Sequence, residues 1–114
     1  MNQRDESFKE FVVDQLRDLE LVEARRMFGG HGLYRDETFF GILHKGKLYF
    51  KIDESTVEEY RKRKMKPFRP NPKQTLKSYY QVPPDIIEDA DRLREWAERA
   101  VRCQGKKAER LSEI

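Results

Sequence analysis

Near the start of the chain, hydrophobic residues recur at spacings of three and four, which is the period of an amphipathic helix. They are Phe8, Phe11, Val12, Leu16 and Leu19. Ser7, with Glu10 three residues later, has the pattern of a capping box, in which each side chain satisfies a free backbone N–H. The pattern predicts a helix that begins at Ser7, after a disordered polar lead over Met1–Glu6.

From Leu21 to Asp53 the hydrophobic period changes towards two, which is typical of strands with one buried face. The predicted strands are Val22–Phe28, Gly32–Arg35, Thr38–His44 and Lys47–Ile52. Lys45-Gly46 has the composition of a tight hairpin turn, because glycine adopts positive φ without steric cost. We therefore expect an antiparallel meander.

A second helix is predicted over Asp53–Lys64, where acidic residues come early and basic residues late, in the order that complements a helix dipole. Lys66–Lys77 contains three prolines, and we expect it to be an irregular loop. Ser78–Val82 has the composition of a short strand.

The last helical region is predicted from about Asp85 to Gln104, with Trp96 beside an apolar stripe and Asp89 able to cap a second helix start. A charged tail follows over Gly105–Ile114. The predicted order is α-β-β-β-α-β-α, a two-layer α/β sandwich of the α+β class with helices on one face of an antiparallel sheet. We expect residues 7–104 to form a single domain.

Composition narrows the functional classes. Hydrophobic residues make up 37% of the 114 residues and charged residues 39%, with a net charge of +3. The single cysteine excludes an internal disulfide and suits a reducing compartment. The polar N-terminal residues do not resemble a signal peptide, and no stretch reaches the roughly 20 apolar residues of a membrane span. We expect a soluble, cytoplasmic protein without membrane contact.

Five motifs occur in a fixed order along most of the chain. They are Arg25-Arg26-Met27-Phe28-Gly29-Gly30-His31-Gly32-Leu33-Tyr34, then Phe39-Phe40-Gly41-Ile42-Leu43, Leu48-Tyr49-Phe50-Lys51, Pro67-Phe68 with Tyr79-Tyr80-Gln81-Val82-Pro83, and Leu93 with Trp96-Ala97 and Ala100. Together they resemble the N-terminal domain family of the TfoX competence regulators, over roughly Phe8 to Val101. The resemblance implies a two-layer fold similar to secretion chaperones, and a link to the regulation of competence and transcription.

The resemblance brings no catalytic residue, metal ligand or cofactor with it. We therefore expect a non-enzymatic regulatory or binding module that acts through a protein partner or as a homodimer. The alternative is direct binding of nucleic acid. A third hypothesis is a small-ligand site at the Gly29–Gly32 turn, with Arg25 or Arg26 beside it.

The glycines of this turn, Gly29, Gly30 and Gly32, could let backbone N–H groups converge on a phosphate or carboxylate, with Arg25 and Arg26 as the cations. The favoured interpretation is a bend between strands. Phosphate loops normally lead into the N-terminus of a helix, whereas this turn leads into another strand.

His31 and His44 are the only histidines, and each is a possible general base. With a single cysteine they make a poor structural zinc site. Cys103 lies near the end of the last predicted helix, and we expect it to pack rather than react. The adjacent acids Glu58-Glu59 and Glu88-Asp89 are interpreted as solvated helix positions.

The strongest charge feature is the segment Arg61–Lys77, with eight basic residues and no acidic one. The basic residues are Arg61, Lys62, Arg63, Lys64, Lys66, Arg69, Lys73 and Lys77. Basic residues next to aromatics such as Phe68 and Tyr79 suit phosphates and exposed bases. The alternatives are a solvated loop with Phe68 in the core, or neutralisation by the acidic segment Asp85–Glu95.

Three aromatic residues, Tyr34, Phe39 and Tyr49, are expected on the sheet face away from the helices. If that face is open, they form an exposed patch of the kind that marks protein interfaces. The alternative is that loops or helix ends cover them.

Overall fold

The computed structural model describes residues 3–27 and 29–106, so residues 1–2, 28 and 107–114 lie outside the described part of the chain. Within that part, one sheet contains β1 (Val22–Met27), β2 (Gly30–Arg35), β3 (Thr38–His44), β4 (Lys47–Lys51), β5 (Pro67–Asn71) and β6 (Gln74–Gln81). The helices of the same residues are α1 (Gln3–Gln15), α2 (Val57–Lys62), α3 (Pro84–Ile87) and α4 (Ala90–Lys106). The α+β class is therefore confirmed. The order within these residues is α-β-β-β-β-α-β-β-α-α, which adds a fourth meander strand, the strand β5 and a second helix at the end to the predicted order.

All neighbouring strands are antiparallel, in the order β1-β2-β3-β4-β6-β5. The first four form the expected meander, and Lys45 and Gly46 have the positive φ of a tight turn. The prediction of a loop over Lys66–Lys77 is wrong, because this segment forms β5 and part of β6. Its three prolines lie in the edge strand β5 and in the β5–β6 turn, where a missing N–H removes no inner ladder hydrogen bond.

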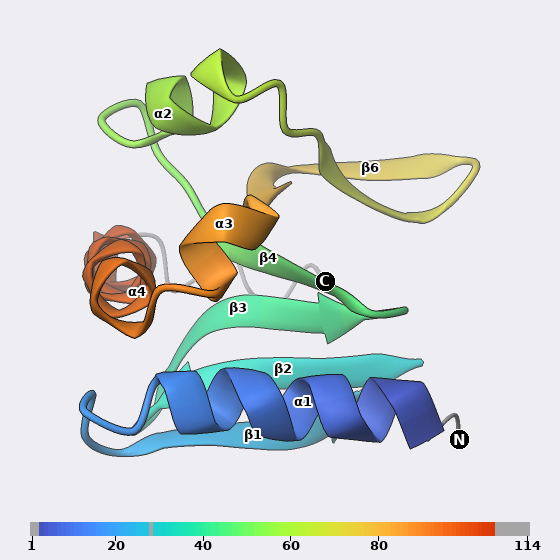
Figure 1. Cartoon of the computed structure of the whole chain (residues 1–114). Helices are drawn as coiled ribbons and strands as arrows, with labels where there is room; N and C mark the ends of the chain where they lie inside the picture. Colours follow the sequence, from blue (N-terminus) through green and yellow to red (C-terminus); the bar gives the residue numbers. More distant parts are fainter. Residues whose placement is uncertain (1–2, 28, 107–114) are drawn as a thin grey trace.

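The helices α1, α3 and α4 lie on one face of the sheet (Figure 1). The main core lies between them and the strands, and its members include Leu16, Leu33, Phe40, Leu48, Phe50, Val82, Ile86, Leu93 and Trp96. The predicted stripe of the last helical region is buried at Ile86, Leu93, Ala97 and Ala100. Phe11, which the helical period assigned to the buried side, is instead 44% exposed.

Two helices begin at residues other than those predicted. α1 begins at Gln3, so Ser7 lies inside the helix and does not cap it. α2 begins at Val57, after a turn that starts at Asp53. The predicted role of Asp89 is confirmed, because its Oδ1 accepts the backbone N–H of Arg92 at 3.2 Å and its carbonyl accepts that of Leu93 at 2.8 Å.

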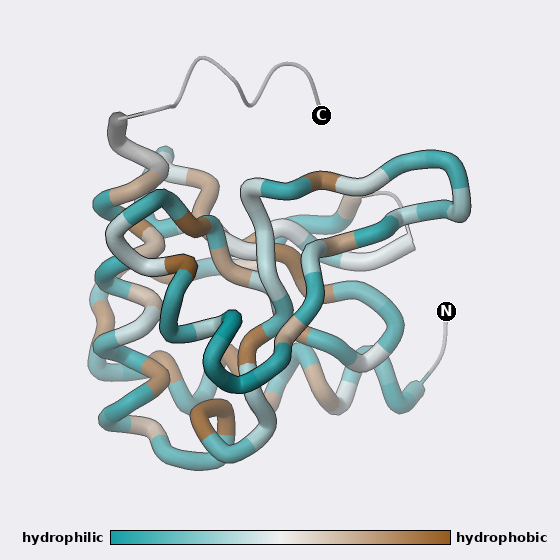
Figure 2. The backbone as a smooth tube through the Cα atoms, turned by 90° about the horizontal axis from the view of Figure 1, so that it is seen from above, coloured by the Kyte–Doolittle hydropathy of each residue, from teal (hydrophilic) through white to brown (hydrophobic). Residues whose placement is uncertain are grey.

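The second face of the sheet carries a smaller core. β3 has a bulge at Phe40, since Leu33 pairs with Gly41 and Tyr34 pairs with Phe39. Phe40 joins the main core, whereas Phe39 and Ile42 belong to a second cluster with Tyr49, Phe68 and Tyr79. The β5–β6 hairpin supplies Phe68, whose ring centroid lies 4.7 Å from that of Tyr49. Figure 2 shows the hydrophilic tip of this hairpin reaching out to the right.

Candidate nucleic-acid interface

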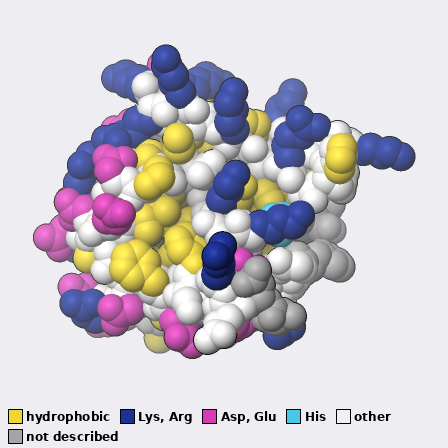
Figure 3. Space-filling model, turned by 45° about the vertical axis from the view of Figure 1, so that its right-hand side comes forward, with side chains coloured by type: hydrophobic (Ala, Val, Ile, Leu, Met, Phe, Trp, Pro, Cys, Tyr) yellow, Lys and Arg dark blue, Asp and Glu magenta, His cyan; other side chains and the backbone are white. Residues whose placement is uncertain are grey.

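Basic side chains gather on α2, on the β5–β6 hairpin and on the segment that connects them. Those exposed in residues 61–77 are called the basic surface below, and they are Arg61, Lys62, Lys64, Lys66, Arg69, Lys73 and Lys77. Figure 3 shows Lys and Arg side chains over the top and right of this view, with most Asp and Glu side chains to the left and below. Within the described residues, none of the seven lies within ion-pair distance of a carboxylate.

The tip of the hairpin holds two of these cations together. Asn71 pairs with Gln74, so the turn between them contains only Pro72 and Lys73. Asn71 Oδ1 accepts the backbone N–H of Lys73 at 2.9 Å, a local bond that favours turns. Arg69 Nη2 donates to the carbonyl oxygen of Pro72 at 2.6 Å. Arg69 and Lys73 are therefore presented at the same end of the hairpin.

Arg63, which the sequence grouped with the other cations, has a structural role. Its Nη1 lies 2.7 Å from Asp85 Oδ2, and its guanidinium lies 5.8 Å from the centroid of the Trp96 ring. The hydrogen bond from Arg63 lowers the pKa of the Asp85 carboxyl. The predicted neutralisation by Asp85–Glu95 thus occurs at Arg63, and the seven cations of the basic surface have no such partner among the described residues.

Arg25 and Arg26 do not join the basic surface. Both are exposed on β1, at the opposite edge of the sheet from β5. Arg25 lies 4.2 Å from the Tyr34 ring centroid, and its Nε is 2.6 Å from Glu23 Oε2. This hydrogen bond to Glu23 raises the pKa of Arg25. The predicted anion contacts therefore separate into two groups.

The glycine turn is a bend between β1 and β2, as favoured from the sequence. Gly29 has a φ of +65°, which side chains rarely adopt. A Cβ at Gly30 would collide with the carbonyl oxygen of Leu43 on β3. These positions need glycine for backbone conformation and for close strand approach, so the turn needs no anion to explain it.

The three predicted interface aromatics lie on the sheet face away from the helices, but two of them are covered. Phe39 is 6% exposed and Tyr49 is 8% exposed, because the hairpin residues Phe68 and Tyr79 pack beside them. Burial raises the pKa of Tyr49. The expected exposed patch is therefore wrong for Phe39 and Tyr49, and a role at an interface stays a prediction for the half-buried Tyr34.

The family model of the TfoX N-terminal domain matches residues 14–104, which include every strand described above. The chain belongs to the TfoX N-terminal domain family. It is also similar to a protein of Spirochaeta aurantia described as an uncharacterized 12.7 kDa protein in the trpE 5′ region. The two are 32% identical over 91 residues, which is 80% of this chain and 75% of that protein.

Membership of the TfoX N-terminal domain family confirms the resemblance drawn from the five motifs and makes the chain a regulatory-domain-like protein. The family is not a known enzyme family. Among the described residues, no helix has both the length and the apolar character needed to span a bilayer.

The histidines of this TfoX N-terminal domain lie in different surroundings. His31 is buried, with its Nε2 3.8 Å from Glu6 Oε2 on α1. His44 is half-buried, and its ring meets Phe68 edge-on at a centroid distance of 5.2 Å. Burial is the main cause that lowers the pKa of both, so both are neutral at pH 7. The described residues contain no cluster of three or more His, Cys, Asp or Glu side chains able to hold a metal ion.

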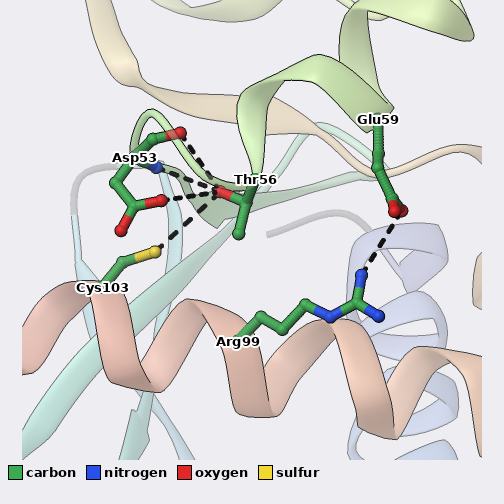
Figure 4. A network of polar contacts seen from close by, with 5 residues as sticks. All are labelled: Asp53, Thr56, Glu59, Arg99 and Cys103. Atoms are coloured by element: carbon green, nitrogen blue, oxygen red, sulfur yellow. Dashed lines mark hydrogen bonds and ion pairs between the residues drawn. The ribbon is translucent and has the colours of Figure 1, made fainter.

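A polar network joins the start of α2 to α4 (Figure 4). Asp53 Oδ1 accepts the backbone N–H of Ser55 at 2.9 Å, and the Asp53 N–H donates to Thr56 Oγ1 at 3.0 Å. Thr56 Oγ1 lies 3.9 Å from Cys103 Sγ. Burial and the neighbouring Asp53 raise the pKa of the buried Cys103 thiol to about 11, so it packs as expected and is a poor nucleophile.

The hairpin also forms a cleft that the sequence did not indicate. A volume of about 320 Å³ lies between its tip and the second face of the sheet. Its lining includes Met27 of β1, His44 of β3 and Leu76 of β6, whereas Arg25 and Arg26 do not line it. The available signal was the Asn-Pro-Lys turn between Phe68 and Leu76, which pair in the hairpin. The three prolines of this segment favoured a loop over a hairpin in the sequence analysis.

Proposed function

We propose that this domain is a non-enzymatic binding module of the regulatory type, and that it binds nucleic acid through the basic surface. The observation that carries the proposal is the set of seven exposed cations on α2, on the hairpin and on the segment between them, with no ion-pair partner among the described residues. The competing hypothesis, a protein interface through an open aromatic patch, loses support because Phe39 and Tyr49 are buried.

The physical basis is the release of counterions from the phosphate backbone. Each phosphate neutralised by a Lys or Arg contributes about −0.9 to the slope of log K against log salt on duplex DNA. A net charge of only +3 gives weak long-range attraction, so binding depends on the local arrangement of these cations. Five of the seven lie outside the helices, which favours contacts to phosphate over sequence readout.

The test is the fluorescence anisotropy of a labelled DNA duplex, measured against the protein at several salt concentrations. We expect affinity to fall steeply with salt. A triple variant, Lys64→Ala, Arg69→Ala and Lys73→Ala, should weaken binding on all sequences. It should also reduce the salt slope by about 3, or about 1 for each phosphate that a removed cation no longer neutralises.

A matched control removes the same charge elsewhere on the surface. Three exposed arginines lie outside the basic surface: Arg17 follows α1, and Arg92 and Arg102 are on α4. Their replacement by Ala should leave the slope almost unchanged. Equal losses of affinity in the two triple variants would reduce the effect to net charge, and the absence of binding at low salt would end the proposal.

A second candidate is a homodimer through β1, which is an edge strand of the sheet. An exposed edge presents unpaired backbone groups that another strand can satisfy. Two copies of β1 paired antiparallel about Ala24 would place Glu23 of each opposite Arg25 of the other, on the same sheet face. Opposite charges in that position stabilise strand pairing, and a two-fold axis repeats the contact.

Light scattering after size exclusion tests this dimer. Arg25→Glu should shift the protein towards monomer, because the carboxylate of Glu23 in each copy would then face a carboxylate at position 25 of the other copy. The double variant Glu23→Arg with Arg25→Glu should restore the dimer. A wild-type protein that is monomeric at every concentration tested would refute the dimer, with no effect on the nucleic-acid proposal.

A further inference from the structure

The cleft under the hairpin has the size of a site for one small ligand. Its volume of about 320 Å³ lies near the lower end of the range of about 300–1,000 Å³ for ligand pockets. One wall is the second face of the sheet, with Met27 and Ile42, and the other is the hairpin, with Leu76. Met27 and Leu76 are half-buried, so part of each apolar side chain remains open to the cleft.

Polar side chains from both walls also line this space. His44 lies on the sheet, while Asn71 and Gln74 flank the hairpin turn. Asn71 Nδ2 and Gln74 Oε1 are 3.4 Å apart, a long contact that leaves both amides able to bond a ligand. The lowered pKa of His44 keeps its imidazole neutral at pH 7, so it offers one donor and one acceptor.

We propose that this cleft binds one planar heteroaromatic ring, with its faces between the apolar walls and its edge on His44, Asn71 and Gln74. Apolar walls suit the faces of such a ring, and amide and imidazole groups read its donors and acceptors. A purely aliphatic ligand would leave the polar groups unsatisfied, and a strongly charged one would lose hydration against Met27, Ile42 and Leu76.

The ring has two possible sources with the same chemistry. It can belong to a free nucleoside-like molecule or to an unpaired base of a nucleic acid strand. Arg69 and Lys73 stand on the same hairpin tip as Asn71, close enough in the chain to meet the phosphates of such a strand. The site does not depend on the proposed duplex binding, because its walls contain no residue of the basic surface.

The test uses two probes: adenosine, and a single-stranded oligodeoxyadenylate compared with a duplex of equal phosphate number. In amide-correlated NMR spectra, adenosine should shift the backbone signals of Ile42–His44 and of Asn71–Leu76. A cleft-filling variant, Leu76→Trp, should weaken adenosine binding at least tenfold. Val13→Trp, a half-buried apolar position on α1, is the matched control and should leave it unchanged.

Gln74→Ala covers the case in which Leu76→Trp does not fold, because Gln74 is exposed at the cleft mouth. It should weaken adenosine binding at least threefold. A preference for the single strand that Gln74→Ala reduces would identify an unpaired base as the source. Adenosine binding without that preference would identify a free small molecule.

Two results would overturn the proposal. One is the absence of cleft shifts with millimolar adenosine together with equal affinity for single strand and duplex. The other is binding that neither cleft variant weakens. With either result, the proposed function would still hold if duplex binding disappeared only in the triple variant of Lys64, Arg69 and Lys73.

Discussion

The two faces of the sheet are covered in different ways. Among the described residues, helices and strands enclose a main core of sixteen buried residues on one face, whereas the second face holds five. The helices meet the sheet along buried stripes such as Val12 with Leu16. The β5–β6 hairpin contributes Phe68 and Tyr79 to the second core and leaves a cleft under its polar tip. The first face supplies most of the stability, and the second face is free to present cations and a cavity.

The largest expected effect comes from the helix-covered face. Phe40 is fully buried in the main core, and its ring centroid lies 5.7 Å from that of Phe50. Phe40→Ala should lower the free energy of unfolding by about 3–5 kcal/mol, because it removes apolar burial and leaves a cavity between rigid layers. Urea denaturation measures this decrease. A decrease below about 1 kcal/mol would mean that the two layers collapse freely and that the comparison of the faces is wrong.

A Phe→Ala substitution on the second face should lower the free energy of unfolding by less. Phe68→Ala removes a side chain that is only 5% exposed, but the hairpin that carries it can close over the space. We expect the free energy of unfolding to fall by about 3 kcal/mol, the lower end for such substitutions, because the cost depends on how well a site collapses.

Hydrogen exchange separates a local from a global effect of Phe68→Ala. The amides of the hairpin should exchange faster, while those of β2 and β3 keep protection that follows global stability. Uniform acceleration across the sheet would instead make the hairpin part of one cooperative unit with the helix-covered core.

The sequence predicted the helix-covered side better than the hairpin side. Regular periods marked the meander and the stripe from Ile86 to Ala100, and each was recovered because burial on one face imposes a period. The hairpin carried no such signal. Its prolines are acceptable only because β5 is an edge strand, and edge position is a property of the tertiary fold.

The candidate site residues also divide into features that the local sequence predicts and features that depend on tertiary contacts. Exposure of the basic residues followed from composition, whereas the pairing of Arg63 with Asp85 depends on a contact across 22 positions that no local pattern encodes. The burial of Phe39 and Tyr49 depends likewise on the hairpin that was not foreseen. The Gly29 turn was correctly interpreted as a bend, because positive φ is a local requirement.

The histidines give a third, smaller effect. Burial lowers the folded-state pKa of His31 and of His44 below the ordinary value of 6.5. The unfolded chain then binds protons more readily, so stability is full above pH 6.5 and falls as pH drops through the lowered values. Glu6 opposes the shift at His31, whereas Lys45 adds to it at His44. The decrease in stability should remain smaller than that caused by Phe68→Ala.

Urea unfolding at pH 5, 6, 7 and 8 checks this dependence. His31→Gln tests the helix-covered face and His44→Gln the cleft, and each should flatten part of the slope between pH 5 and 6.5. The carboxyls of Asp53 and Asp85, whose pKa values are lowered, contribute to the pH dependence only below about pH 5 and so scarcely overlap this window. A slope that neither variant changes would contradict the assignment.

The smallest expected effect concerns the ion pair that ties the base of the basic surface to the helix layer. Arg99 Nη1 on α4 lies 3.3 Å from Glu59 Oε1 on α2, with side chains 41% and 51% exposed. Exposed pairs of this kind contribute about 0.2–1 kcal/mol, so a double-mutant cycle of Arg99→Gln and Glu59→Gln should give a coupling near the lower value. Tyr60, which is 3% exposed and packs 4.8 Å from the Trp96 ring, is then the residue that holds α2 in place. A coupling above about 1 kcal/mol would instead make the ion pair the main anchor of α2, and with it of the cations that follow it in the chain.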